Sequence, residues 1–215
     1  MKKTPKGRFT LQWMTGTALM IALELVLGST PLGRITMPFL TATTMHIPVI
    51  LATLVLGLEA GVLVGFTFGV HSLISNLTGA SFFAPFFINP LVSVLPRVLF
   101  PVAVYVIAAL IRRVAGRFDP HHVVAYVLAS ALGTALHTTM VMGMIGLLYA
   151  GRIANMISAG LSVPDAIANA QHGVAAGIAL MGVANGIPEA IVAAVIAPAV
   201  AVALDKALGR IRIRK

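Results

Sequence analysis

Long apolar runs separated by short polar segments dominate the pattern of the chain. Most of these runs approach or exceed the ~20 residues that an α-helix needs to cross a bilayer. The short alternating segments of a transmembrane β-barrel do not occur. We therefore predict an all-α membrane protein with six transmembrane helices in a single domain of residues 1–215. The predicted spans are 11–28, 45–58, 60–76, 89–113, 123–150 and 174–208.

The first and last apolar runs differ from simple membrane spans. At ~1.5 Å per residue, the last apolar run is too long for one span, so its first part is expected to lie in the outer loop region. The N-terminal basic cluster before the first apolar run is typical of a signal peptide, but no small-x-small cleavage site follows Gly28. We expect an uncleaved first span.

The composition agrees with a membrane protein. Hydrophobic residues make up 59% of the sequence, charged residues only 10%, and the mean hydropathy is +0.99. These values are outside the range of soluble globular domains. Cysteine is absent, which excludes a disulfide framework, a thiol nucleophile and a thiolate metal site.

The basic residues orient the predicted spans. Arg34 and Arg152 fall on one side, Arg97 falls within the membrane, and the other twelve of the 15 Lys and Arg fall on the opposite side. The positive-inside rule therefore predicts cytoplasmic N and C termini. The net charge of +9 thus reflects topology, and a nucleic-acid partner is not expected. The twelve are Lys2, Lys3, Lys6, Arg8, Arg112, Arg113, Arg117, Lys206, Arg210, Arg212, Arg214 and Lys215.

Arg97 is the one cation predicted to lie well inside the membrane. A guanidinium stays charged, and a charge in hydrocarbon is costly unless it faces a partner or a wet cavity. Counted from the cytoplasmic end of each helix, Glu24, Arg97, His137 and Glu189 all lie roughly 20–24 Å up, in the outer half of a core of roughly 30 Å. The inner half is almost free of charge. The pattern predicts a pocket open to the outside and closed below.

Helical spacing groups the polar residues into faces. Asn89, Ser93 and Arg97 form one stripe, and Asn185 and Glu189 are one turn apart on the last span. His137 and Thr138 share a face of the fifth span with Ser130 and Thr134. The candidate substrate-binding residues are Arg97, Asn89, Ser93, His137, Thr138, Asn185 and Glu189.

Other interpretations of the polar residues remain open. Arg97 can instead pair internally with Glu24 or Glu189 and lock the bundle. His46 and His71 are expected to be hydrogen-bonded packing residues. No helix carries a two-ligand metal motif such as HExxH, and no nucleophile signature occurs. We therefore expect no metal, no cofactor and no catalytic residue, so the protein is not predicted to be an enzyme.

Small residues also recur at helical spacing. Gly57, Gly61, Gly65 and Gly69 repeat every four residues and are expected to allow close internal packing. Ala18 and Ala22 form a second pair, about 140° around the first helix from Glu24. With Glu24 inside, this pair faces outward, toward lipid or toward another membrane protein.

The chain resembles the substrate-binding (S) component of an energy-coupling factor (ECF) vitamin transporter. The resemblance covers nearly the whole chain and departs from the family at His137 and Glu59. It is carried by Ala18-x-x-x-Ala22, Met45-His46-Ile47-Pro48, the glycine series, Asn89-Pro90, Pro96-Arg97 and Asn185.

The resemblance implies a mechanism and partners. An S component in a prokaryotic plasma membrane captures a vitamin in its outer half, joins a transmembrane coupling subunit and two ATPase subunits, and topples to release the vitamin inside. Ala18 and Ala22 would dock the coupling subunit. The sequence has no Gly-rich phosphate loop, so the partners would hydrolyse ATP.

The pattern is most similar to pantothenate-type S components. Pantothenate has a carboxylate for Arg97, and hydroxyl and amide groups suited to Asn89, His137, Thr138 and Asn185. Riboflavin or another flat vitamin is the alternative, with stacking on Phe82, Phe83, Phe86 and Phe87. A stand-alone proton-coupled secondary transporter is a further alternative, using Glu24, Arg97, His137 and Glu189.

Overall fold

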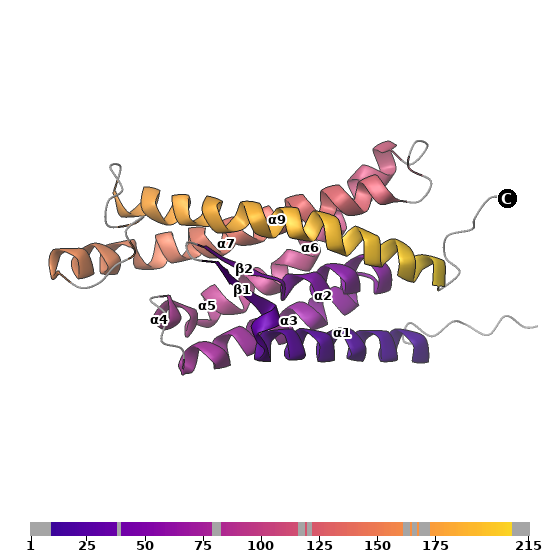
Figure 1. The fold of residues 1–215 in the computed structure, drawn as a ribbon, viewed down its shortest axis with the longest axis horizontal. Coiled ribbons are helices and arrows are strands. Elements are labelled where there is room, and N and C mark those ends of the chain that lie inside the picture. Colours follow the sequence, from indigo (N-terminus) through magenta and orange to yellow (C-terminus); the bar gives the residue numbers. More distant parts are fainter. Residues whose placement is uncertain are drawn as a thin grey trace, which may run out of the picture.

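The computed structural model describes residues 10–37, 40–78, 83–115, 119, 122–160, 164, 167 and 173–207. The basic residues predicted at both termini, together with Arg117 and Phe82, lie outside these ranges. The elements are α1 (Leu11–Ser29), η1 (Pro31–Gly33), β1 (Arg34–Met37), β2 (Leu40–Thr43), α2 (His46–Leu51), η2 (Ala52–Leu56), α3 (Leu58–Leu77), α4 (Ala84–Phe87), α5 (Pro90–Ser93), α6 (Leu95–Ala115), α7 (Val123–Ser158) and α9 (Val174–Ala207) (Figure 1).

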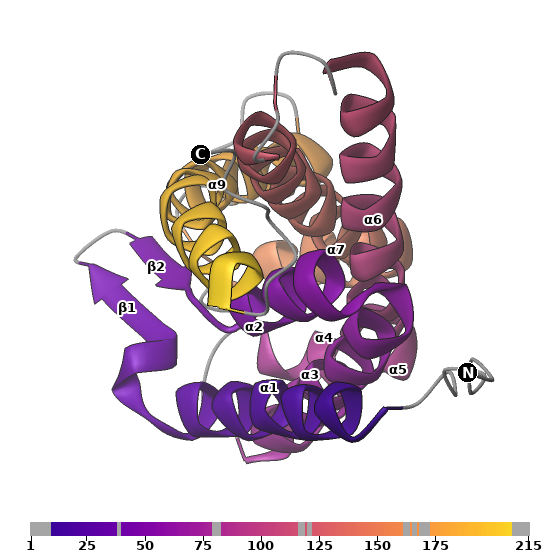
Figure 2. The same ribbon diagram turned by 90° about the vertical axis from the view of Figure 1, so that its right-hand side faces the viewer.

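The long helices extend along the length of the molecule in Figure 1, and Figure 2 shows that α1 and α6 are inclined to each other. Five helical segments are long and apolar enough to cross a membrane, and the apolar helix at His46–Leu56 is shorter. The first residue of α1 and the last residue of α9 lie at the same end of the bundle (Figure 1). The structure thus confirms a multi-pass helical membrane protein.

The helices α7 and α9 are longer than one span requires. They contain 36 and 34 residues, about 54 and 51 Å at ~1.5 Å per residue, against a hydrocarbon core of roughly 30 Å. The pair extends past the other helices at the end opposite to the start of α1 (Figure 1). The sequence predicted the excess length of α9, but it ended the fifth span at residue 150, eight residues before α7 ends.

The span predicted at 89–113 agrees with Pro90–Val114, which is long and apolar enough to cross a membrane. Within this span, Val94 separates α5, which ends at Ser93, from α6, which begins at Leu95. The structure corrects one predicted position. Glu59, predicted to lie in a turn, belongs to the first turn of α3. The turn itself is at Gly57, whose φ of 104° favours glycine.

A short β-hairpin replaces part of the loop that the sequence predicted at residues 29–44. The strands β1 and β2 pair antiparallel, with Arg34 opposite Thr43. The backbone N–H of Thr44 donates to the Gly33 carbonyl over 3.1 Å, which closes the base of the hairpin. The hairpin lies beside α9 (Figure 2). The segment that follows the first helix therefore contacts the last one.

Glycines let α3 lie directly against the backbone of α5 and α6. A Cβ on Gly65 would overlap the carbonyl oxygen of Arg97, and a Cβ on Gly69 would lie 2.8 Å from Cα of Val94. A Cβ on Gly61 would meet Thr53 and Pro101. The structure confirms that these glycines serve internal packing, and it shows that the packing positions the main chain of Arg97.

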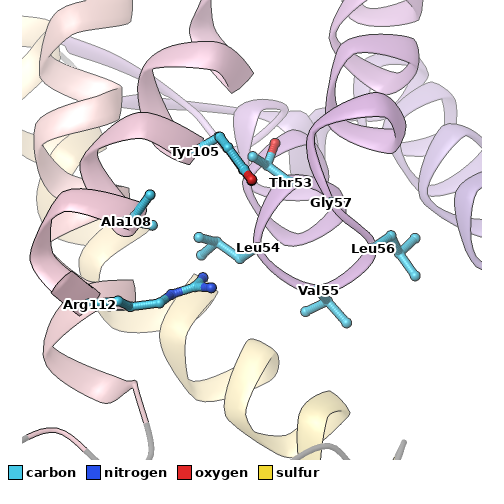
Figure 3. A pocket seen from close by; sticks show the side chains of 9 residues that line it. Thr53, Leu54, Val55, Leu56, Gly57, Tyr105, Ala108 and Arg112 are labelled. Atoms are coloured by element: carbon cyan, nitrogen blue, oxygen red, sulfur yellow. The ribbon is translucent and has the colours of Figure 1, made fainter. Parts of the chain in front are cut away.

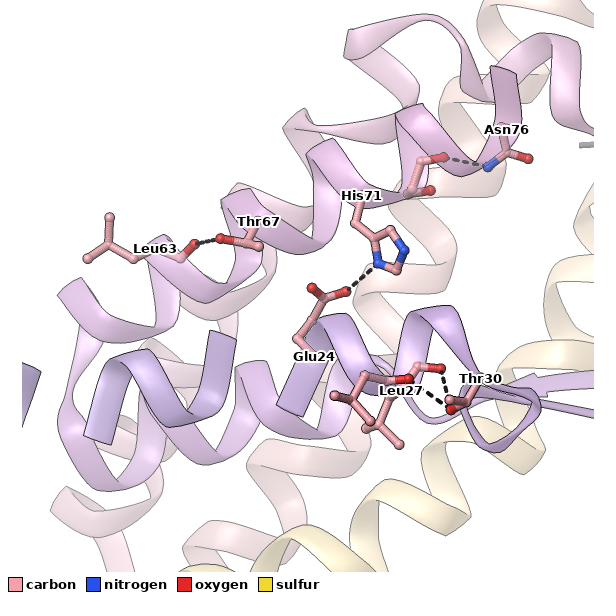
Figure 4. Close-up of polar contacts among 9 residues, drawn as sticks. Glu24, Leu27, Thr30, Leu63, Thr67, His71 and Asn76 are labelled. Atoms are coloured by element: carbon pink, nitrogen blue, oxygen red, sulfur yellow. Dashed lines mark hydrogen bonds and ion pairs between the residues drawn. The ribbon is translucent and has the colours of Figure 1, made fainter. Parts of the chain in front are cut away.

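A buried ion pair joins α1 to α3. The Glu24 carboxylate is fully buried, and its Oε1 lies 3.2 Å from Nδ1 of His71 (Figure 4). The His71 ring fits there because a Cβ on Gly28 would overlap it. His71 is therefore hydrogen-bonded, as predicted, and Glu24 has a partner other than Arg97.

Replacing Gly65 with Ala should destabilise the protein by about 1–3 kcal/mol, because the added methyl forces α3 away from the Arg97 carbonyl. Thermal unfolding in detergent measures the effect. The control is Gly143→Ala in α7, where an added Cβ meets nothing within 4 Å and which should be neutral or slightly stabilising. Equal destabilisation by both changes would contradict the packing argument.

Replacing His71 with Leu should cost about 1–3 kcal/mol of stability, because it leaves the buried Glu24 carboxylate without its partner. The double variant Glu24→Leu/His71→Leu should recover part of that loss, since both polar groups are then removed. Unfolding of the wild type, both single variants and the double variant gives the coupling energy. Strict additivity of the two single losses would show that the pair is not coupled.

Candidate binding site

Glu189 connects three elements. It is 7% exposed on α9. Its Oε1 accepts hydrogen bonds from the backbone N–H and the hydroxyl of Thr43 at the end of β2, over 2.9 and 2.7 Å. Its Oε2 accepts from the hydroxyl of Thr138 on α7 over 3.3 Å. Three donors therefore stabilise the carboxylate and tie the hairpin to α7 and α9.

Arg97 lies near the start of α6 and is 6% exposed. Its Nη1 donates to the Val92 carbonyl over 2.6 Å, while Nε has no hydrogen-bond partner. Cζ lies 5.4 Å from the ring centroid of Phe68 and 5.1 Å from that of Phe87. Two aromatic faces thus stabilise the cation.

The internal ion pair considered for Arg97 does not form within the described part of the chain. Glu24 contacts His71, and Glu189 accepts hydrogen bonds from threonines. The charge of Glu189 acts on Arg97 electrostatically, but the two groups are not in ion-pair contact. The bundle is therefore not locked by a salt bridge at Arg97.

Two histidines lie buried beside Arg97. The His137 ring centroid is 5.0 Å from that of Phe100 and 6.1 Å from that of Phe68. The His46 ring centroid is 6.4 Å from that of Phe100. Phe68 contacts both Arg97 and His137, and Phe100 contacts both His137 and His46. Thr138, next to His137, donates to Glu189. Arg97, His46, His137 and Glu189 thus form one group, which we call the polar cluster.

The polar cluster contains many polar atoms without partners. Neither ring nitrogen of His46 or His137 has a hydrogen bond. Outside the cluster, the buried hydroxyls of Thr134 and Ser130, one and two turns before His137 on α7, have none either. Buried polar atoms in native proteins are nearly always hydrogen-bonded, so such a group requires an explanation. The prediction of a hydrogen-bonded His46 is wrong: sequence reasoning missed His46 because a single histidine near a helix start carries no spacing signal.

The other candidates make contacts of their own. Asn89 caps α5 by accepting from the Leu91 N–H and donates to the Tyr149 hydroxyl, both over 3.0 Å. The Ser93 hydroxyl donates to the Phe87 carbonyl. The break between α5 and α6 therefore divides the predicted stripe: Asn89 and Ser93 make local hydrogen bonds around α5, and Arg97 belongs to α6. Asn185 is half-buried one turn before Glu189.

A groove between α7 and α9 is less suitable for a polar ligand. It has a volume of about 600 Å³, and Thr138 and Thr139 are its only polar lining residues. Thr138 donates to Glu189, and Thr139 donates to the Ala135 carbonyl of its own helix. No free polar side chain faces this groove, whereas the polar cluster has several. Among the described residues, no group of three or more His, Asp or Glu is arranged to hold a metal ion.

Ala18 and Ala22 are both exposed on α1, on the side away from the buried Glu24. The large side chains of Leu19 and Leu23 are exposed beside them. This is the outward orientation that the helical spacing predicted. Ala18, Leu19, Ala22 and Leu23 therefore form an exposed apolar face on α1.

Comparison with known proteins identifies the family of the chain. No curated protein matches it. The sequence model of a family described as the substrate-specific component of an ECF transporter matches residues 12–201. This range contains the whole polar cluster and every described helix except the first residue of α1 and the last residues of α9. The match indicates a transport function in a membrane, not an enzyme. The chain therefore belongs to the ECF transporter substrate-specific component family.

Proposed function

We propose that the chain binds a small carboxylate-bearing vitamin, pantothenate as the best candidate, at the polar cluster. One observation carries this proposal: the buried Arg97 guanidinium has no carboxylate partner among the described residues, and its Nε and the ring nitrogens of His46 and His137 have no hydrogen bond. A ligand that brings a carboxylate and several hydrogen-bonding groups would satisfy both deficits.

The chemistry of pantothenate fits this arrangement. Its carboxylate would bind Arg97 through a charge-assisted hydrogen bond, with Nε as the free donor. Its hydroxyl and amide groups would bind the ring nitrogens of His46 and His137 and the hydroxyls of Ser130 and Thr134, which are both donor and acceptor. Glu189, held by Thr43 and Thr138, would orient the ligand by accepting a hydrogen bond from one of its hydroxyl groups.

The aromatic residues favour pantothenate over a flavin. Phe86 is 1% exposed, and its ring packs against Tyr149 with centroids 4.8 Å apart. Phe83 also contacts Phe86, and Phe87 lies over Arg97. These rings already pack on one another or on the cation, so within the described chain they present little open face to stack a flat vitamin.

The topology follows from the charges. We infer six spans with both termini in the cytoplasm, the sixth being the short helix of α2 and η2. Arg97 is near the start of α6, while the basic Arg112 and Arg113 are in its last turn. The polar cluster then opens toward the outside, and the β-hairpin, hydrogen-bonded to Glu189, covers it from the outer face.

We further infer that transport needs partners. The exposed face of Ala18 and Ala22 would dock the transmembrane coupling subunit, because small residues let helices approach closely in a membrane. Two ATPase subunits would supply the energy. A stand-alone proton-coupled transporter would need ionisable groups at successive depths, whereas Arg97, His137 and Glu189 are expected at one level.

Replacing Arg97 with Met should weaken pantothenate binding by about 10–100-fold, because a charge-assisted hydrogen bond contributes roughly 1.5–3 kcal/mol. Equilibrium binding to the purified protein measures this. The neutral alcohol pantothenol, which lacks the carboxylate, should bind wild type and variant equally weakly.

Several results would overturn the assignment. Equal affinity of the wild type for pantothenate and pantothenol would show that Arg97 does not bind the carboxylate. Tight riboflavin binding without pantothenate binding would assign a different vitamin. Uptake by this chain alone, driven by a proton gradient and indifferent to ATP, would exclude the S-component mechanism.

Replacing both Ala18 and Ala22 with Leu should prevent co-purification with the coupling subunit while leaving vitamin affinity unchanged, because the added volume blocks close helix packing. The matched control is Ala199→Leu/Ala203→Leu, an exposed pair at the same spacing on α9, which should assemble normally. Assembly of the Ala18/Ala22 variant at wild-type yield would place the docking face elsewhere.

A further inference from the structure

A pocket lies beside the last turns of α6, whereas Arg97 of the polar cluster lies near the start of that helix; Figure 3 shows this pocket from close by. It has a volume of about 260 Å³ and is formed by η2, Gly57 and the last turns of α6. It shares no residue with the polar cluster. The lining residues are Thr53, Leu54, Val55, Leu56, Gly57, Tyr105, Ala108, Ala109 and Arg112.

Arg112 gives this pocket a positive charge. Its side chain points into the pocket opposite Leu54 (Figure 3). Cζ lies 5.3 Å from the ring centroid of Tyr126, whose hydroxyl donates to the buried Asp205. Nε is buried without a hydrogen-bond partner, and no carboxylate of a described residue is in ion-pair contact with the guanidinium. The protein therefore positions the cation and leaves it available to an oxyanion.

The other lining residues include two polar ones, Thr53 and Tyr105, and several aliphatic ones. Leu54 faces α6 from the side of η2 (Figure 3), and Ala108 and Ala109 line the pocket on the side of α6. Tyr105 precedes Arg112 by two turns of α6, roughly 10 Å further into the bundle, and is 45% exposed. The pocket therefore has a cationic end in the last turn of a membrane-spanning helix and an aliphatic end toward the membrane interior.

We propose that this pocket binds an anionic phospholipid. The phosphodiester lies on the Arg112 guanidinium, and the upper part of an acyl chain lies along the aliphatic wall between Leu54 and Tyr105. Arginine binds phosphate oxygens by paired charge-assisted hydrogen bonds. Basic pockets between transmembrane helices on the cytoplasmic side suit anionic headgroups. Only an amphiphile satisfies both ends of the pocket, whereas a free phosphate would use the cation alone.

The test uses thermal unfolding of the purified full chain in detergent. Phosphatidylglycerol is compared with phosphatidylcholine of the same acyl chains and with inorganic phosphate. Phosphatidylglycerol should raise the unfolding temperature of the wild type, and the other two additives should not. In Arg112→Gln, the apparent affinity for phosphatidylglycerol should fall at least about tenfold, by loss of a hydrogen-bonded charge.

Two further variants sharpen the test. Arg113→Gln removes the same charge from the next residue, which is exposed, and should keep the wild-type response. Ala109→Leu fills the pocket and keeps both arginines, so phosphatidylglycerol should no longer raise its unfolding temperature. If Arg112→Gln does not fold, Ala109→Leu tests the proposal in its place.

Four outcomes would overturn the proposal. Equal losses in Arg112→Gln and Arg113→Gln would indicate diffuse attraction without a site. Equal stabilisation by phosphatidylcholine would show that the headgroup charge is not recognised. Stabilisation by inorganic phosphate alone would assign a free oxyanion. Unchanged lipid response with impaired assembly in Arg112→Gln would make the pocket a contact for the coupling subunit.

Discussion

A charged arginine inside a membrane bundle is the constraint on which the site depends. Arg97 keeps its charge, so the surrounding helices must compensate it. They do so with one backbone carbonyl and two aromatic faces and without a carboxylate in contact among the described residues. These contacts hold the guanidinium in place but do not neutralise its positive charge. A buried positive charge without a contacting carboxylate attracts an anion.

The position of Arg97 depends in turn on glycine. Gly65 and Gly69 bring α3 against the main chain of Arg97 and Val94, and Phe68 on the same helix then faces the guanidinium. A tight interface of two backbones resists displacement, because there is no side chain to rearrange. These two glycines therefore hold Arg97 in position, although neither belongs to the polar cluster.

Glu189 has a complementary role. It stabilises no cation by contact, and instead it accepts hydrogen bonds from Thr43 and Thr138. The β-hairpin is thereby linked to the same helix surface that faces the polar cluster. A ligand that hydrogen-bonds to the Glu189 oxygens would compete with Thr43 and Thr138 for them. Binding of such a ligand would therefore change how firmly the hairpin is attached to α9.

The sequence by itself determined the class of fold, the long apolar helices and the residues that matter most, because hydropathy and helical spacing are local properties of the chain. It could place Arg97, His137 and Glu189 at one depth, and the outward face of Ala18 and Ala22, by counting residues along each helix. It could not choose their partners. The pairing of Glu24 with His71, the inclusion of His46 in the polar cluster, the hairpin bound to Glu189 and the break after Ser93 depend on how the helices are rotated and packed against one another. Only the tertiary structure decides the contacts of Glu24, His46 and Glu189, because each one joins groups far apart in the sequence.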